Sequence, residues 1–235
     1  MENVTNLHVL QWRVFAPDVV PYHLIITPWG TDFLKHVFGF READWNREGA
    51  DYVFQDGTYK PEGEGEPTVI PSLAFNDRRI AVQVRGGSDA AAAVYVAVAQ
   101  ALAQLSPAFP EVHPLLMSED TSCVARLDFD WTALLNPALL EHVAEWVTVA
   151  ARDEVESAIK GISVRFTVGA MPSKKLVEYG VSVYDRTIAV EPRADVPLSE
   201  QTYFTYSPCD SDTHLKLIAQ LETSLSKKPG RIAKR

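Results

Sequence analysis

The stretch SLAFNDRRIAVQVRGGSDAAAAVYVAVAQALAQL, residues 72–105, decides the fold class of this chain. Two apolar runs, 72–75 and 79–84, flank a three-residue polar turn, which is typical of a β-hairpin. The residues GGSD at 86–89 then end the second strand and cap a helix that is rich in alanine, the residue with the highest helix propensity. The sequence therefore predicts a hairpin followed by a helix that packs its valine and leucine side chains on a sheet.

Similar patterns on both sides of this stretch predict further strands and helices. Strands are expected at 7–15, 22–27, 123–130, 162–168, 176–183, 187–192 and 202–207. Helices are expected to begin at Thr31-Asp32, at Asn136-Pro137 and at Asp210, the last of them running to about Ser226. The segment 46–71 is polar and is interpreted as a surface loop, with its acidic, glycine-rich part at 56–67 expected to be mobile.

The apolar side of each periodic segment predicts the core. These residues are Leu102, Leu127, Phe129, Leu140, Val143, Val147, Ile188, Val190, Leu217 and Leu221.

A short internal sequence repeat, which we call the echo, suggests how the elements are organised. DRRIAVQVR at 77–85 and DRTIAVEPR at 185–193 agree at six of nine positions, a match expected by chance roughly 0.1 times in a chain of this length. We therefore expect an α+β fold of two related units, 1–116 and 117–226, each a small antiparallel sheet with helices on one face and possibly ferredoxin-like. The segments 72–85 and 176–193 should then be equivalent hairpins.

Composition excludes several classes of protein. The chain has 235 residues, with 46% hydrophobic and 23% charged side chains, which are globular values. No apolar run approaches the roughly 18 residues of a membrane span, and the N-terminus lacks the basic segment of a secretory signal. Two cysteines, Cys123 and Cys209, are too few for a disulfide scaffold, so we expect a cytoplasmic protein.

Charge is distributed unevenly along the chain. The first 225 residues carry 17 basic and 31 acidic side chains, a net charge of −14. Such a body repels phosphate backbones, so nucleic-acid binding is not expected except through the tail, residues 227–235. The tail carries the basic residues Lys227, Lys228, Arg231, Lys234 and Arg235. A tail of this kind is also typical of a solubilising terminus without a partner.

Asp128 and Asp130 are the first candidate catalytic residues. Two positions apart on a strand, their carboxylates share one face and could divide acid and base roles or hold a divalent metal, with His214 as a third group. The alternative is a solvent-exposed strand face in which Arg126 supplies the counter-charge.

Asp210, Asp212 and His214 form a second candidate, because carboxylates and an imidazole at this spacing could bind a transition metal. The alternative is that both aspartates cap the final helix and that His214 is exposed in its first turn. Cys209 could be a nucleophile near a helix N-terminus, but no signature of a cysteine enzyme surrounds it. No cofactor-binding motif is present, so no cofactor is expected.

Four residues are candidates for binding: Arg78 and Arg186 in the two DR turns, and Trp29 and Trp45 in an aromatic-rich N-terminal third. We therefore expect a non-enzymatic interaction protein of bacterial type that binds a protein partner or itself, as a subunit of a complex or as an inhibitor. The alternative is a metal-dependent hydrolase or nuclease that uses the carboxylate and histidine residues.

Overall fold

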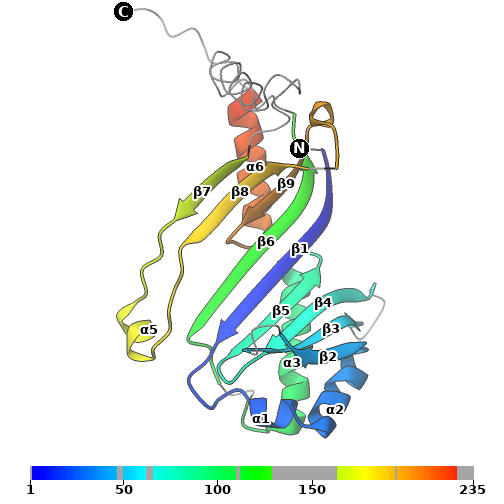
Figure 1. Ribbon diagram of the computed structural model, residues 1–235, viewed down its shortest axis with the longest axis vertical. Coiled ribbons are helices and arrows are strands. Elements are labelled where there is room, and N and C mark those ends of the chain that lie inside the picture. Colours follow the sequence, from blue (N-terminus) through cyan, green and yellow to red (C-terminus); the bar gives the residue numbers. More distant parts are fainter. Residues whose placement is uncertain are drawn as a thin grey trace, which may run out of the picture.

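One continuous antiparallel sheet organises the chain (Figure 1). The computed structural model describes residues 2–46, 50–61, 66–109, 112–128, 163–193 and 195–226. In these residues, nine strands are arranged in the order β2-β3-β4-β5-β1-β6-β9-β8-β7. The strands are β1 (Glu2–Val14), β2 (Glu42–Trp45), β3 (Tyr52–Tyr59), β4 (Thr68–Phe75), β5 (Arg79–Arg85), β6 (Leu116–Arg126), β7 (Val164–Val168), β8 (Arg186–Pro192) and β9 (Thr202–Ser207).

The helices connect these strands. They are α1 (Tyr22–Ile25), α2 (Pro28–Phe38), α3 (Ser88–Leu105), α5 (Lys174–Glu178) and α6 (Ser211–Ser226), with a short 3₁₀ turn, η3, at Leu198–Glu200. The mixed α+β class is thus confirmed, and the helix expected from Asn136-Pro137 lies outside the described residues.

The expectation of two small sheets is wrong, because β1 and β6 pair along their length and join the halves into one sheet. Val9 lies opposite Thr121 and Gln11 opposite Glu119 in this central ladder. The pairing covers a strand edge in each half, which would otherwise be open to association. The described strands also depart from the ferredoxin-like pattern, since β2 to β5 are four consecutive strands of a meander.

The two echo segments occupy different positions in the sheet. Residues 72–85 form the expected hairpin of β4 and β5, and β5 also pairs with β1. Residues 176–183 instead contribute to the helix α5 and a loop, and β8 pairs with β7 and β9. Ser173 caps α5 by accepting a hydrogen bond from the Leu176 amide, and Gly180 follows its end at φ +64°, a conformation that favours glycine. The predicted equivalence of the two hairpins is therefore wrong.

Three local predictions also need correction. Residues 22–27 begin as the helix α1 rather than a strand, in spite of their β-branched side chains. The helix α2 starts at Pro28 rather than near Thr31, because Thr27 accepts a hydrogen bond from the Gly30 amide and proline is favoured at the first helical position. Much of the expected loop at 46–71 is strand, and its segment 62–65 lies outside the described residues.

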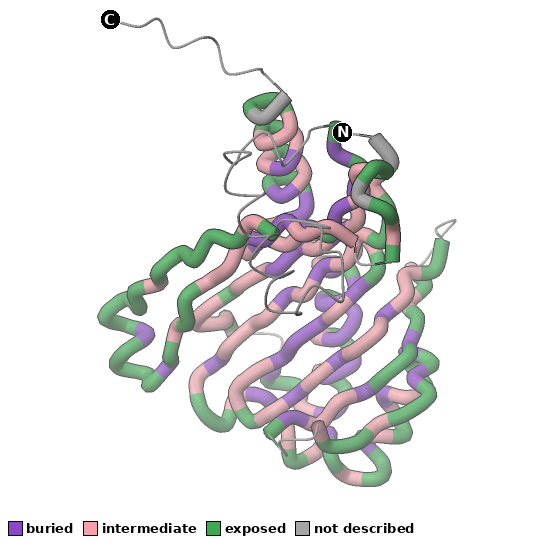
Figure 2. Tube along the Cα trace, turned by 45° about the horizontal axis from the view of Figure 1, so that its top comes forward, coloured by how far each residue is buried: buried purple, intermediate pink, exposed green. Residues whose placement is uncertain are grey.

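The helices α3 and α6 cover the same face of the sheet, each over one half of it (Figure 1). Phe15, Phe54 and Phe75 belong to the larger apolar cluster under α2 and α3. A smaller cluster under α6 contains Tyr203 and Ile218. Figure 2 shows how buried positions follow the central strands.

The predicted core is confirmed at three of its described positions, Leu102, Leu127 and Val190, which are buried. Leu217 and Leu221 are half-buried, because His214 and Ile218 provide the inward side of α6 instead, and Ile188 on β8 is half-buried as well. Phe129, Leu140, Val143 and Val147 lie outside the described residues.

Among the described helices, only α3 has the length and the apolar composition of a membrane span. We did not predict a segment of this kind from the sequence. The helix contacts β1 and β5, and its Val94, Val98 and Leu102 side chains are fully buried. Packing in the core therefore accounts for its apolar character.

The N-termini of α3 and α6 meet and cap each other. The Ser88 amide donates to Ser211 Oγ at 3.0 Å, and the Ser211 amide donates to Ser88 Oγ at 2.8 Å. The Ser88 hydroxyl also donates to the Glu119 carboxylate on β6. Each serine thus satisfies an amide at the start of the other's helix, which fixes the two helices relative to each other across the centre of the sheet.

Candidate functional site

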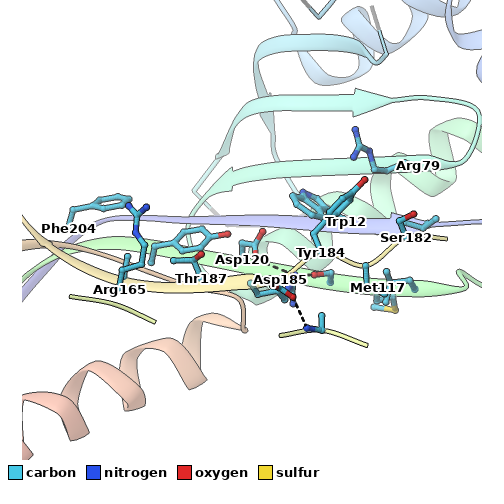
Figure 3. A pocket seen from close by; sticks show the side chains of 18 of the residues that line it. Trp12, Arg79, Met117, Asp120, Arg165, Ser182, Tyr184, Asp185, Thr187 and Phe204 are labelled. Atoms are coloured by element: carbon cyan, nitrogen blue, oxygen red, sulfur yellow. Dashed lines mark hydrogen bonds and ion pairs between the residues drawn. The ribbon is translucent and has the colours of Figure 1, made fainter. Parts of the chain in front are cut away.

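The face of the sheet opposite the helices, which we call the open face, contains a cavity of about 750 Å³, the main pocket (Figure 3). Side-chain alternation explains its location. Gln11 and Glu119 point to the helices with Ser88, so their neighbours Trp12, Ser118 and Asp120 point to the open face. Residues of β8 and β9 complete the lining, among them Thr187, Ala189, Phe204 and Tyr206.

The connection between β7 and β8, residues 169–185, forms an arm that lines one side of the main pocket. Asp185 accepts a hydrogen bond from the Ala170 amide at the base of the arm, 3.2 Å away. Farther out, Arg78 Nη2 donates to the Tyr179 carbonyl over 2.6 Å and thereby ties the arm to the β4–β5 turn. The arm contributes Tyr184 to the lining of the cavity that Trp12 also lines (Figure 3).

A polar cluster around the buried Asp120 forms part of the lining of the main pocket. Arg186 donates to Ser118 Oγ and to Asp120 Oδ1, the latter at 3.3 Å. Burial raises the pKa of the Asp120 carboxyl, while Arg186 and a hydrogen bond from Tyr206 oppose that rise. Burial, together with the Asp120 charge, raises the pKa of Tyr206 to about 12. The groups therefore satisfy one another, and the phenol stays protonated at neutral pH.

Exposed apolar side chains surround this polar cluster. Met117 is 56% exposed, Phe204 40% and Tyr184 79%, and all three line the main pocket. An apolar surface of this kind, with a few oriented polar groups, is typical of a binding site.

A second hollow of about 440 Å³, the basic hollow, adjoins the main pocket and shares Phe204 with it. It is lined by Asn6, His8, Arg85, Ser122, Val124, Arg193 and Phe204. The Nδ1 atom of His8 is buried without a hydrogen-bond partner. Burial and then the Arg85 charge lower the pKa of His8. The hollow thus offers the guanidinium of Arg85 and the hydroxyl of Ser122, groups suited to an anion.

The structure places the four predicted binding residues in three different settings. Arg186 belongs to the polar cluster of the main pocket, whereas Arg78 holds the arm. Trp29 is 62% exposed on α2 and stacks on Phe33, and Trp45 is 46% exposed on β2. The two tryptophans do not line either cavity.

Asp128 and His214, the two described residues of the first predicted catalytic site, are not brought together. Asp128 is exposed, and its amide donates to Glu222 Oε1 at 2.8 Å, eight residues beyond His214 on α6. Eight helical residues span about 12 Å, so Asp128 lies far along the helix from the imidazole. Asp130 lies outside the described residues.

His214 is fully buried between α6 and the sheet rather than exposed in the first turn. Its Nδ1 lies 2.6 Å from Ser207 Oγ and its Nε2 lies 2.9 Å from Thr205 Oγ1. One donor and one acceptor nitrogen fit a neutral imidazole. Burial lowers the pKa of His214 to about 4, so the ring is neutral at physiological pH.

Asp210 and Asp212 do not join His214 in a metal site. Asp210 caps α6 by accepting a hydrogen bond from the Thr213 amide at 2.9 Å, as the alternative reading had it. Asp212 is exposed, and no group of three His, Cys, Asp or Glu residues in the described parts of the chain could hold a metal ion. Burial raises the pKa of the Cys209 thiol, which disfavours the nucleophilic thiolate.

Sequence reasoning missed Asp120, Tyr206 and His8 as site residues. The signal for Asp120 was present in the stretch LMSEDTSCVAR, where strand alternation continues upstream of the expected start at residue 123. The signal for Tyr206 was the alternation of TYFTYS, which places Phe204 and Tyr206 on one face. No linear signal connects His8 to Arg85, because their neighbourhood depends on β1 pairing with β5.

Comparison with known proteins gives no further indication of function, because no protein family matches this sequence and no curated protein is significantly similar to it.

Proposed function

We propose that this chain is a non-enzymatic interaction protein of the cytoplasm that binds a protein partner through its open face, as a subunit of a complex or as an inhibitor. The main pocket carries the proposal. Its volume of about 750 Å³ is large enough for one or two large side chains of a partner. The free thiols of Cys123 and Cys209 support a reducing compartment.

The chemistry of the main pocket supports binding more than catalysis. Asp120 is held by Arg186 and Tyr206, and the high pKa of Tyr206 makes this phenol a poor base at neutral pH. The exposed rings of Tyr184 and Phe204 would lose contact with water on association, which is the main source of affinity at protein interfaces.

A pull-down from the native host, read by mass spectrometry, tests the proposal. We expect the wild-type chain to retain a specific partner that Phe204→Glu loses. Val96→Glu is the matched control, because Val96 is 54% exposed on α3, which packs on the opposite face. A partner retained equally by all three proteins would place the interface elsewhere and contradict the proposal.

The metal-dependent hydrolase or nuclease receives no support from a specific contact. Its three residues would have to act together, yet Asp128 and His214 are separated along α6, and His214 is enclosed by Thr205 and Ser207.

An internal duplication also remains our proposal, with a different alignment from the one the echo suggested. In each half, the strand before a helix that starts with Ser-Asp pairs with the first strand: β5 with β1, and β9 with β6. This equivalence matches α3 with α6 and is supported by the reciprocal caps of Ser88 and Ser211.

A further inference from the structure

The basic hollow extends the proposed function, on which the following inference rests. His8 and Trp12 lie on the same face of β1, four residues apart, one in the basic hollow and the other in the main pocket. Four residues of a strand span about 13 Å. Phe204 lines both cavities and bridges them. A ligand that fills both must therefore be elongated.

The charges of the two cavities indicate what the ligand carries. Five arginines and three carboxylates line them, a local positive excess on a chain whose net charge is −9. Four of these arginines form ion pairs, with Asp51, Glu191, Asp120 and Asp195.

Arg85 is the remaining arginine, and within the described residues it makes no ion pair. It lies opposite His8 in the ladder of β1 and β5, and both residues line the basic hollow. An anion placed there would pair with the guanidinium. Ser122 offers a second donor on the neighbouring strand.

We propose that the partner docks with a short extended segment that places an apolar side chain in the main pocket and a carboxylate in the basic hollow, four residues apart. Side chains at i and i+4 of an extended chain point the same way and are about 13 Å apart, which matches the spacing of the two cavities. The chemical class is thus a protein segment of the pattern apolar-x-x-x-Asp/Glu. The net charge of −9 on the whole chain disfavours nucleic acid as the occupant.

Binding of designed peptides to the full ¹⁵N-labelled chain tests the pattern. The probes are Ac-FTSTE-NH₂, its neutral form Ac-FTSTQ-NH₂, its apolar truncation Ac-ATSTE-NH₂, and Ac-FETST-NH₂, which has the same composition with a different spacing. We expect Ac-FTSTE-NH₂ to shift the amide resonances of Arg85, Ser122 and Phe204 and to bind at least about tenfold more tightly than each of the other three peptides. A hydrogen-bonded charge contributes about tenfold, and a buried aromatic ring contributes that much or more.

Two variants assign the effect to the basic hollow. Arg85→Gln should remove the difference between the Glu and Gln peptides, whereas Arg41→Gln, which changes an exposed arginine that lines neither cavity, should preserve it. Equal binding of Ac-FTSTE-NH₂ and Ac-FETST-NH₂, or a difference that survives Arg85→Gln, would overturn the inference. Shifts of the same residues by inorganic phosphate at equal affinity would also overturn it, by showing a general anion site.

The pull-down and the peptide titration can fail separately. A partner that Phe204→Glu loses but Arg85→Gln retains would leave the proposed function in place and reject the acidic pattern. A partner that both variants retain would reject the proposed function itself.

Discussion

Stability of this protein should depend steeply on pH between about 4 and 6.5, because of His214. The imidazole is fully buried, bonded to Ser207 and Thr205, and its pKa is lowered to about 4 by burial. In the unfolded chain the same ring has a pKa near 6.5. As the pH falls below that value, the unfolded state binds a proton that the folded state does not, so the stability contributed by the neutral ring is lost.

The size of the effect follows from the two pKa values. At pH 7.5 the ring is neutral in both states, and at pH 5 it is charged mainly in the unfolded state, which lowers the free energy of unfolding by about 2 kcal/mol. The full loss approaches about 3 kcal/mol below pH 4. A loss of this size is a large fraction of the stability of an ordinary domain.

Urea denaturation of the wild type and of His214→Gln at pH 7.5 and pH 5 measures this contribution. Glutamine keeps hydrogen-bonding capacity but does not titrate, so the difference between the two pH dependences isolates His214 from the carboxylates. We expect the wild type to lose about 2 kcal/mol more than the variant. Parallel losses in the two proteins would refute the reasoning. In the wild type, the ring resonances of His214 should stay unshifted from pH 7 to 5, an independent check should the variant not fold.

Three further measurements test other parts of the structure. Ser211→Ala should lower the free energy of unfolding by about 1–2 kcal/mol in a urea titration, because the Ser88 amide loses its hydrogen-bond partner. The control is Ser224→Ala at an exposed position of α6, which should change the free energy of unfolding by less than about 0.5 kcal/mol. Arg78→Ala should release the arm at 169–185, so that its amides exchange hydrogen faster than in the wild type while exchange in α3 is unchanged. Equal exchange rates of the arm in the variant and the wild type would show that the Tyr179 contact does not hold it. Leu102→Ala should cost about 2–5 kcal/mol in chemical denaturation, and a cost near zero would mean that α3 is not packed on the sheet.

Local patterns predicted the elements whose side chains follow a regular period. The hairpin of β4 and β5, the helix α3 and the strand alternation of Cys123, Ala125 and Leu127 follow from residue order, because one face of each is buried. The same reasoning failed at 22–27 and 176–183. There the chain forms the short helices α1 and α5, which Pro28 and Gly180 follow, and each helix buries a single side chain, Ile25 or Leu176. A strand pattern of this length therefore did not determine the local structure.

The site was harder to predict than the fold because its residues come from strands that are distant in sequence. His8 reaches Arg85 and Ser122 through two ladders, and Asp120 reaches Arg186 across β9. His214 shows the opposite error: its position in the first turn of α6 suggested exposure, but Thr205 and Ser207 of the preceding strand provide a buried polar environment.

The acidic body and the basic cavities impose different conditions on a partner. At a distance, a chain with net charge −9 repels polyanions, so encounters with nucleic acid or uniformly acidic proteins are slowed. At contact, Arg85 in the basic hollow favours one carboxylate at a defined distance from an apolar side chain. The long-range repulsion therefore disfavours polyanions, which Arg85 alone would attract. The apolar main pocket supplies the affinity that a single exposed charge pair lacks. Added salt should therefore weaken the binding of Ac-FTSTE-NH₂ only modestly, because most of the affinity of this peptide comes from the buried phenylalanine ring.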